Sequence, residues 1–216
     1  MHKKTFYERF FKRPLDIVFS LLGLIVLSPV FLIIAVLVRI KLGSPVIFKQ
    51  ERPGKDEKIF KLYKFRSMKN AYDKEGKPLP DEERLTSFGK KLRSTSLDEL
   101  PELWNILKGD MSFVGPRPLA ISYLSYYTEQ ERHRHDVRSG LTGLAQINGR
   151  NNISWEDRFA YDIFYITHLT FFRDLKILME TIIVVFKRSD IVTRGCNNIL
   201  DFDEYRKNQL MGKGDK

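Results

Sequence analysis

Two adjacent acids, Asp98 and Glu99, stand at the start of a segment with helical periodicity and are the residues best placed to do chemistry. The sequence from 93 to 118 reads RSTSLDELPELWNILKGDMSFVGPRP. Ser96-x-x-Glu99 matches a capping box, which would make both acids simple helix-start residues. Pro101 instead favours a helix that begins at Asp98, because its missing N–H then falls where no intrahelical partner is needed. We therefore predict a helix over about residues 98–108 with Asp98 as its N-cap.

A carboxylate at a helix N-terminus has a chemical use beyond capping. The helix dipole and the free N–H groups hold the carboxylate ionised, and the same groups attract phosphate. An ionised carboxylate beside a bound phosphate is what a nucleophile needs to form an acyl phosphate. Spacing alone nevertheless favours plain N-capping for Asp98 over this catalytic role.

Two arginines bracket the acidic pair in sequence. Arg93 lies five residues before Asp98, and Arg117 lies within Gly115-Pro116-Arg117-Pro118. Prolines on both sides of Arg117 restrict the backbone, which favours a positioned guanidinium suited to two-pronged phosphate recognition. The alternative is a proline-stiffened loop that carries a solvated arginine.

Two other short motifs are weaker signals. His133-x-His135 has the form of a metal-binding pair, but no Cys or third His follows at ligand spacing, so we expect no zinc site. Asp201-Phe-Asp203 fits the Asp-x-Asp metal motif of glycosyltransferases that move a sugar without its phosphate. That activity is the alternative enzyme class for this chain.

Composition limits the partners of the chain. Its 216 residues are 43% hydrophobic and 30% charged, as expected for a folded protein, and 37 basic against 27 acidic residues give a net charge of +10. Such a surplus attracts nucleic acid, an anionic membrane surface or phosphorylated small molecules, so a non-catalytic basic binding module is a second alternative. A single cysteine, Cys196, excludes an internal disulfide.

An apolar segment at residues 17–38 predicts a membrane anchor. It holds 22 residues without a charge, and a straight helix of that length rises roughly 33 Å. Ser28-Pro29 interrupts its middle, and basic residues flank both ends, with ten Lys and Arg against three acids over residues 39–69. Positive charge stays cytoplasmic, which favours a helix that enters and returns, although a proline-kinked spanning helix fits the same features. Asp16, at the edge of the segment, is expected to cap, to pair with Arg13 or to lie at the interface.

The remaining chain has the pattern of a compact domain followed by a tail. Residues 46–48 and 59–65 predict two short strands joined at Pro53-Gly54, and residues 70–83 predict a surface loop. Helices are expected from about Pro118 to Arg134 and, as two or more amphipathic helices, over residues 154–187. The dense aromatic residues of 154–187 suit either a membrane interface or a packed core. The last 15 or so residues predict a mobile tail.

Three segments resemble, in the same order, the motifs of the bacterial sugar transferase family. They read KIFKLYKFRSM, SLDELPELWNILKGDMSFVGPRP and HDVRSGLTGLAQINGR. The resemblance is to the small members of the family, the monotopic phosphoglycosyl transferases, one of which initiates protein N-glycosylation, and it extends from the apolar segment to about Ser189. Ser139 departs from the pattern, because relatives usually have Pro there, and the final 25 or so residues have no counterpart.

The resemblance implies a fold and a domain organisation. The implied α+β fold has an N-terminal re-entrant membrane helix bent at Ser28-Pro29 and a small, mostly helical cytoplasmic domain with amphipathic interfacial helices and a short β-hairpin. The corresponding domains are an anchor at 1–42, a catalytic domain at 43–190 and a C-terminal tail at 191–216. The implied location is the cytoplasmic face of the bacterial inner membrane.

The resemblance also implies a reaction. A sugar phosphate passes from a UDP-sugar to undecaprenyl (polyprenyl) phosphate, with release of UMP and an aspartyl phospho-sugar intermediate, and this step initiates a surface glycan or glycoprotein. Asp98 is implied as the nucleophile and Mg²⁺ ligand, with Glu99 as its partner. The other implied site residues are phosphate-facing Lys64, Arg93, Arg117 and Arg150, and an additional acid, Asp162. Membrane lipids are implied partners, nucleic acid is not, and a homodimer is left open.

Overall fold

The N-terminal apolar segment forms two helices that meet at a bend. In the computed structural model, which describes residues 2, 4–149, 153–187 and 200–211, α1 (Arg13–Val26) and α2 (Ser28–Leu42) follow a single π-helical turn, η1 (Glu8–Lys12). The predicted break at Ser28-Pro29 is confirmed, because the helix axes differ by 62° there. Within the described residues, no single helix is long and apolar enough to cross a bilayer, whereas the bent pair meets that test when both halves are taken together.

Both ends of this bent pair are fastened to the rest of the molecule. Asp16 does not pair with Arg13 as one prediction allowed; its buried carboxylate accepts hydrogen bonds from the Ser112 hydroxyl and the Phe113 N–H, each at 3.1 Å. Arg13 instead donates to the carbonyls of Ile106 and Leu107, at 2.6 and 2.8 Å, which lie at the C-terminal end of a helix where cations are favoured. The start of α1 is therefore fixed to residues 106–113.

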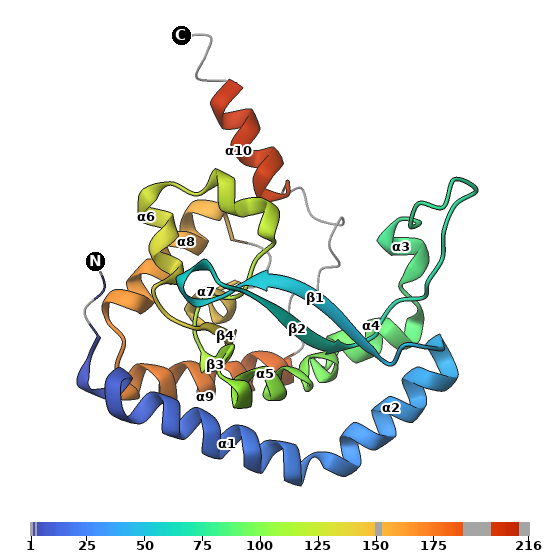
Figure 1. Cartoon of the computed structure of the whole chain (residues 1–216), viewed down its shortest axis with the longest axis horizontal. Helices are drawn as coiled ribbons and strands as arrows, with labels where there is room; N and C mark the ends of the chain where they lie inside the picture. Colours follow the sequence, from blue (N-terminus) through green and yellow to red (C-terminus); the bar gives the residue numbers. More distant parts are fainter. Residues whose placement is uncertain (1, 3, 150–152, 188–199, 212–216) are drawn as a thin grey trace.

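The end of α2 is held by an apolar cluster and by one arginine. Val38 and Leu42 pack with Phe65 and Leu92 in a buried cluster. Arg66 donates to the carbonyls of Leu42 and Ser44, which closes the turn after the helix. Figure 1 shows the result, with α1 and α2 forming a shallow V along one side of the molecule and the other elements gathered inside it.

Two small sheets organise the domain. The predicted hairpin is confirmed: β1 (Ile47–Pro53) pairs antiparallel with β2 (Ile59–Phe65). A second sheet was not predicted, in which β3 (Met111–Val114) pairs parallel with β4 (Ser139–Thr142). Parallel strands need a long crossover, and here the crossover carries the Gly-Pro-Arg-Pro segment.

Short helices and turns connect these sheets. Before β3 the elements are η2 (Lys55–Glu57), α3 (Asp81–Arg84), α4 (Ser87–Ser94), η3 (Leu97–Glu99) and α5 (Glu102–Lys108). Between β3 and α8 they are η4 (Ile121–Tyr126), α6 (Glu129–Arg132), η5 (His133–His135), β4 and α7 (Leu144–Ile147). The single helix predicted from about Pro118 to Arg134 is wrong, because residues 127 and 128 are extended and divide it, with Thr128 capping α6.

Three further helices complete the described part of the chain. They are α8 (Trp155–Thr167), α9 (Phe171–Lys187) and α10 (Phe202–Met211). The prediction of two or more helices over residues 154–187 is confirmed with two, and their aromatic residues divide between buried and exposed positions. Trp155, Phe159 and Tyr165 are buried in the core, whereas Phe164, Phe171 and Phe172 are exposed. The mobile tail predicted for the last 15 or so residues is wrong over its first part, because α10 is a helix anchored by fully buried Phe202.

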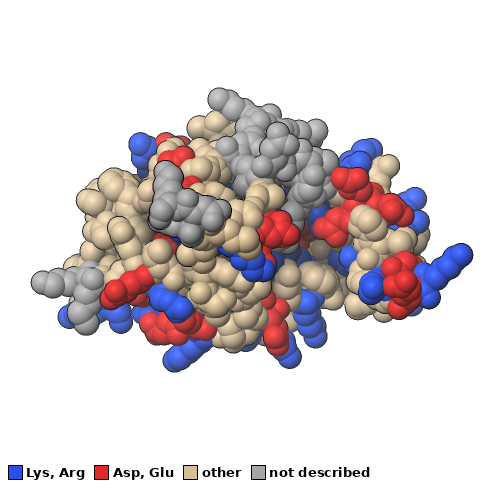
Figure 2. Space-filling model, turned by 90° about the horizontal axis from the view of Figure 1, so that it is seen from above, with Lys and Arg blue, Asp and Glu red and all other residues tan. Residues whose placement is uncertain are grey.

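The surface of the molecule combines charged regions with an extended apolar stretch on the α1–α2 pair. Seen from above, acidic and basic side chains mingle over the face opposite the α1–α2 pair (Figure 2). The pair itself exposes large apolar side chains along both helices. They are Ile17, Val18, Phe19, Leu21, Leu22, Ile25 and Val26 on α1 and Leu32, Ile33, Val36, Leu37 and Ile40 on α2. A soluble protein rarely leaves an apolar patch of that extent open to water.

Candidate active site

The segment that carries Asp98 and Glu99 is a tight turn rather than the start of a helix. Ser96 adopts a left-handed backbone, with φ of 55°, and opens the 3₁₀ turn η3, while α5 begins only at Glu102. Neither Ser96 nor Pro101, the residues that precede η3 and α5, forms a side-chain cap, so the predicted N-cap role of Asp98 and the capping box are both wrong. The acids turn instead toward a group of cations, whose charges act on Asp98.

Glu99 is the centre of this group. Its Oε1 accepts hydrogen bonds from Lys64 Nζ at 2.6 Å and from Arg117 Nη2 at 2.9 Å. Lys64 comes from β2 and Arg117 from the loop after β3. The turn, the hairpin and the loop therefore meet at one carboxylate, which places two of the cations implied as phosphate-facing, Lys64 and Arg117, beside the acidic pair.

A third carboxylate, Glu102, belongs to the same group and was not predicted. Its side chain is buried, and its Oε1 lies 3.1 Å from Lys64 Nζ without a hydrogen bond of its own. The spacing contained a signal for it, because residues three and four apart on a helical segment share a face, and Glu102 follows Glu99 by three and Asp98 by four. Lys64 thus stands between two acids.

Burial and charge separate the pKa values of the three acids. Burial raises the pKa of Asp98 to about 6, with repulsion from Glu99 adding to the rise, while Lys64, Arg93 and Arg117 oppose it. The helix dipole expected at Asp98 would have lowered this pKa, so the direction of the shift is opposite to that expectation. Burial acts to raise the pKa of Glu99 as well, but the direct bonds from Lys64 and Arg117 outweigh it and hold that pKa well below its usual range. Burial raises the pKa of Glu102 to about 7, against the pull of Lys64.

Unlike Glu99 and Glu102, Asp98 forms no ion pair with any of the described residues. Its side chain is buried, and none of the described residues forms a hydrogen bond to its carboxylate. Arg93, at the end of α4, donates from Nε to the Ser67 hydroxyl at 2.8 Å, and its charge reaches Asp98. Asp98 is therefore a carboxylate of raised basicity, surrounded by cations whose direct bonds go elsewhere.

The loop that carries Arg117 is held by close backbone packing. The Gly115 N–H donates to the Thr142 carbonyl at 2.9 Å, and the Gly140 N–H donates to the Pro116 carbonyl at 3.0 Å. A Cβ at Gly115 would lie 2.3 Å from the Arg138 carbonyl oxygen, so the two segments can approach this closely only with glycine. The two prolines and this contact together support the predicted positioned guanidinium.

Asp162 lies behind this loop rather than beside the acidic pair. It forms a buried ion pair with Arg134 at 2.9 Å, and Arg134 Nη2 also donates to the Arg117 carbonyl at 2.8 Å. Burial raises the pKa of Asp162, and Arg134 acts against the rise. Asp162 thus contacts the candidate site through Arg134 and the Arg117 backbone.

The other predicted positions fall into two groups. Arg150 lies outside the described residues, so its place relative to Asp98 is not described. The two histidines do not act as a pair: His135 is buried with Nδ1 3.1 Å from the Gly54 carbonyl, and His133 lies 3.0 Å from Asp136.

Among the described residues no three His, Cys, Asp or Glu side chains gather as a preformed metal cage. Asp98 still fits Mg²⁺, because this ion is commonly held by one or two carboxylates together with substrate phosphates.

Comparison with known proteins places the chain in a family. Residues 7–188 match the model for bacterial sugar transferase, so the chain belongs to the bacterial sugar transferase family and is a transferase enzyme. This confirms the resemblance found in the motifs. The match includes the bent helix pair, both sheets, α8 and α9, and ends before α10.

Three relatives illustrate the family. The chain is 52% identical over 171 residues to the uncharacterized sugar transferase EpsL of Bacillus subtilis (strain 168), a match that spans 79% of this chain and 85% of the relative. It is 45% identical over 182 residues to a UDP-glucose:undecaprenyl-phosphate glucose-1-phosphate transferase of Klebsiella pneumoniae, spanning 80% of this chain and 39% of the relative. It is 37% identical over 199 residues to an undecaprenyl-phosphate galactose phosphotransferase of Salmonella typhimurium, a match that spans 84% of this chain and 41% of the relative. The chain thus matches about two-fifths of the length of these last two relatives.

The charge group predicts a measurable change in the titration of Asp98. In Lys64→Met the cation that lowers the pKa of Asp98 is gone, so that pKa should rise above its value of about 6. Lys61→Met is the matched control, because Lys61 lies on the same strand but is exposed. NMR titration of ¹³C-labelled aspartate in both variants measures the shift. An Asp98 titration that is identical in the wild type and Lys64→Met would contradict the charge group described above.

Proposed function

We propose that this chain transfers a sugar phosphate from a UDP-sugar to undecaprenyl or another polyprenyl phosphate, releasing UMP, with Asp98 as the covalent nucleophile. The observation that carries the proposal is the setting of Asp98, a buried carboxylate without a hydrogen-bond partner among Lys64, Arg93 and Arg117. The printed names of the Klebsiella and Salmonella relatives, which describe transfer to undecaprenyl phosphate, support the same reaction. As part of this proposal, the product of the reaction is the first lipid-linked intermediate in the assembly of a surface glycan or glycoprotein.

The chemistry divides into two displacements at one phosphorus. In the first, a carboxylate oxygen of Asp98 bonds to the sugar-linked phosphorus, and the bond from that phosphorus to the bridging oxygen breaks, so that UMP leaves with the electron pair. In the second, a phosphate oxygen of the polyprenyl phosphate attacks the same phosphorus and displaces the Asp98 carboxylate. The products are UMP and a polyprenyl diphosphate sugar, and no water or external oxidant takes part.

The residues around Asp98 supply alignment and charge. Arg117 has five N–H donors, and within the described residues its half-exposed guanidinium forms one bond, to Glu99, so the remaining donors are available to a diphosphate. Glu99 keeps Arg117 and Lys64 in place while the site is empty of substrate. The raised pKa of Asp98 makes its anion a stronger nucleophile than an ordinary exposed carboxylate.

Mg²⁺ fits the same place as part of this proposal. Asp98, together with the two phosphates of the donor, provides the kind of oxygen ligands that Mg²⁺ takes. When bound, the ion neutralises negative charge that develops on the phosphate oxygens. Glu99 is engaged by two cations and is the less suitable ligand.

We further propose that residues 1–42 anchor the enzyme as a re-entrant membrane helix on the cytoplasmic face of the inner membrane, beside the catalytic domain at 43–190. Both ends of the α1–α2 pair are fastened to the domain, and the bend at Ser28-Pro29 lies between them. The apolar side chains exposed along the pair need an apolar environment, and a lipid acceptor is presented at the membrane surface. Exposed Phe172, Met179 and Ile183 on α9 extend this surface as an interfacial helix.

The released nucleotide tests the reaction. Purified enzyme given Mg²⁺, undecaprenyl phosphate and a panel of UDP-sugars should release UMP with at least one donor. A glycosyltransferase that moves the sugar without its phosphate, the class suggested by Asp201-x-Asp203, would release UDP instead. Release of UDP, or binding of nucleic acid without any turnover across the panel, would overturn the proposal.

Replacing Asp98 separates its proposed catalytic role from any structural one. Asp98→Asn should lower turnover by orders of magnitude, because an amide is neither an anionic nucleophile nor an equivalent Mg²⁺ ligand. Asp98→Ala should do the same without the cost of about 1 kcal/mol expected for a lost helix cap, because Asp98 caps no helix here. UMP assays and thermal unfolding measure the two effects. Near-normal turnover in folded Asp98→Asn would remove Asp98 from the reaction.

Labelling of single cysteines tests the anchor. In a Cys196→Ser background, cysteines placed at Lys4 and at Lys41 should both resist a membrane-impermeant reagent in intact cells, because a re-entrant pair returns both ends to the cytoplasm. Both positions should react after permeabilisation. Pro29→Leu should straighten the pair and expose one end outside. Labelling of position 4 in intact cells without that change would contradict re-entry and leave the chemistry unaffected.

A further inference from the structure

The helix α10 lies outside the part of the chain that matches the family, yet it is bound to the core. The family match ends at residue 188, and α10 covers Phe202–Met211. Phe202 at its start is fully buried. Trp155 Nε1, on α8, donates to the carbonyl of Leu200 at 3.0 Å and secures the residue just before the helix.

Phe202 packs in the middle of an aromatic cluster formed by residues far apart in sequence. Its ring stacks on Tyr127 with centroids 5.4 Å apart, and it contacts Phe159 at 5.0 Å and Trp155 at 5.2 Å. Tyr123 completes the cluster at 5.4 Å. Aromatic pairs at such distances add to the free energy of packing beyond the area that they bury.

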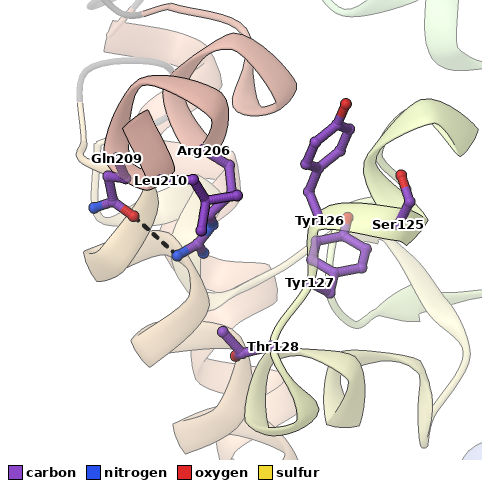
Figure 3. Close-up of a pocket in the computed structure, with 7 residues that line it drawn as sticks. All are labelled: Ser125, Tyr126, Tyr127, Thr128, Arg206, Gln209 and Leu210. Carbon is purple, nitrogen blue, oxygen red and sulfur yellow. Dashed lines mark hydrogen bonds between the residues drawn. The ribbon is translucent and has the colours of Figure 1, made fainter. Parts of the chain in front are cut away.

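Polar contacts fix the rest of α10 against the same segment. Arg206 Nη2 donates to Glu131 of α6 at 2.5 Å, while Arg206 Nη1 donates within α10 to Gln209 at 3.0 Å. Arg206 and Leu210 of α10 face Tyr126 and Tyr127 across a groove (Figure 3), whose volume is about 260 Å³. Direct contact between α10 and Tyr127 is made by the stacked ring of Phe202.

Three hydrogen bonds connect Tyr127 with the candidate active site: Tyr127 to Arg134, Arg134 to Arg117, and Arg117 to Glu99. The Tyr127 hydroxyl accepts a hydrogen bond from Arg134 Nη1 at 3.2 Å. Arg134, itself buried, is held by Asp162 and donates from Nη2 to the Arg117 carbonyl at 2.8 Å. Arg117 in turn donates to Glu99 at 2.9 Å. Each contact is direct, so the Tyr127 hydroxyl and the backbone of Arg117 are joined through the single side chain of Arg134.

We propose that α10 is a positioning element of the enzyme, in which Phe202 holds Tyr127 so that Arg134 fixes the backbone of Arg117. The proposal rests on the proposed function only in assigning Arg117 to the donor phosphates. Loss of the Phe202 ring leaves an unfilled space beside Tyr127, and buried clusters relax into such a space only in part. A guanidinium that must meet two phosphate oxygens is sensitive to displacements of this kind, since an error of 1 Å can cost roughly a hundredfold in rate.

Truncating Phe202 is the first test. Phe202→Ala should lower kcat/KM for the UDP-sugar by about tenfold or more at a temperature where the variant is folded. Met211→Ala is the matched control, because Met211 is an exposed apolar residue of the same helix, and it should keep wild-type kinetics. Phe202→Leu should restore most of the activity by refilling the space. A folded Phe202→Ala enzyme with wild-type kcat and KM would overturn the proposal and leave α10 a purely stabilising helix.

The second test removes one atom from the linked contacts and does not depend on how well Phe202→Ala folds. Tyr127→Phe keeps the ring stacked on Phe202 but removes the hydroxyl that Arg134 contacts, so kcat/KM should fall several-fold at a temperature where the variant is folded, and the melting temperature should fall by only a few degrees. In Arg117→Lys, which should itself have low activity, adding Tyr127→Phe should cost much less, because contacts in one network are non-additive. Losses in kcat/KM that add fully in the double variant, or a kcat/KM unchanged by Tyr127→Phe alone, would overturn the proposed connection between Tyr127 and Arg117. Normal activity of Arg117→Lys alone would instead contradict the role of Arg117 in the proposed function.

Discussion

The site depends on the ion pairs that the partly buried Glu99 forms with Lys64 and Arg117. Taking a carboxylate out of water costs free energy unless the carboxylate is paired, so both cations must lie accurately beside Glu99. Lys64 is positioned by the β1–β2 hairpin. Arg117 is positioned by the close backbone contact between Gly115, just after β3, and Gly140, in β4. The small sheets therefore matter less for their size than for bringing two cations to one acid.

This arrangement leaves Asp98 in an unusual state. Because the cations are engaged with Glu99, they neutralise the surroundings of Asp98 without hydrogen-bonding to it, and burial keeps its pKa near 6. Such a carboxylate is ionised at neutral pH and is still basic enough to attack phosphorus. The bent helix pair, fastened to the domain at both ends, fixes the height of this site relative to the apolar surface that the pair exposes.

Local patterns in the sequence predicted the parts of the fold that local forces determine. The bend at Ser28-Pro29 follows from proline chemistry, and the hairpin follows from β-rich runs on both sides of Pro53-Gly54. The parallel β3–β4 pair could not be read in this way, because four-residue strands carry little periodicity and their pairing is non-local. The helix start at Asp98 was misplaced because tertiary contacts with cations outweighed capping. Docking of Phe202 also depends on distant aromatic residues that no local pattern reveals.

The covalent step offers the most direct measurement of the central claim, that Asp98 is a nucleophile. Wild-type enzyme mixed with Mg²⁺ and a UDP-sugar accepted as donor, without a lipid acceptor, should gain the mass of one sugar phosphate as it releases one equivalent of UMP. Peptide mapping should place the added mass on Asp98, and polyprenyl phosphate should remove it. Release of UMP only after the acceptor is added, with no adduct at any time, or an adduct on another residue, would contradict the account.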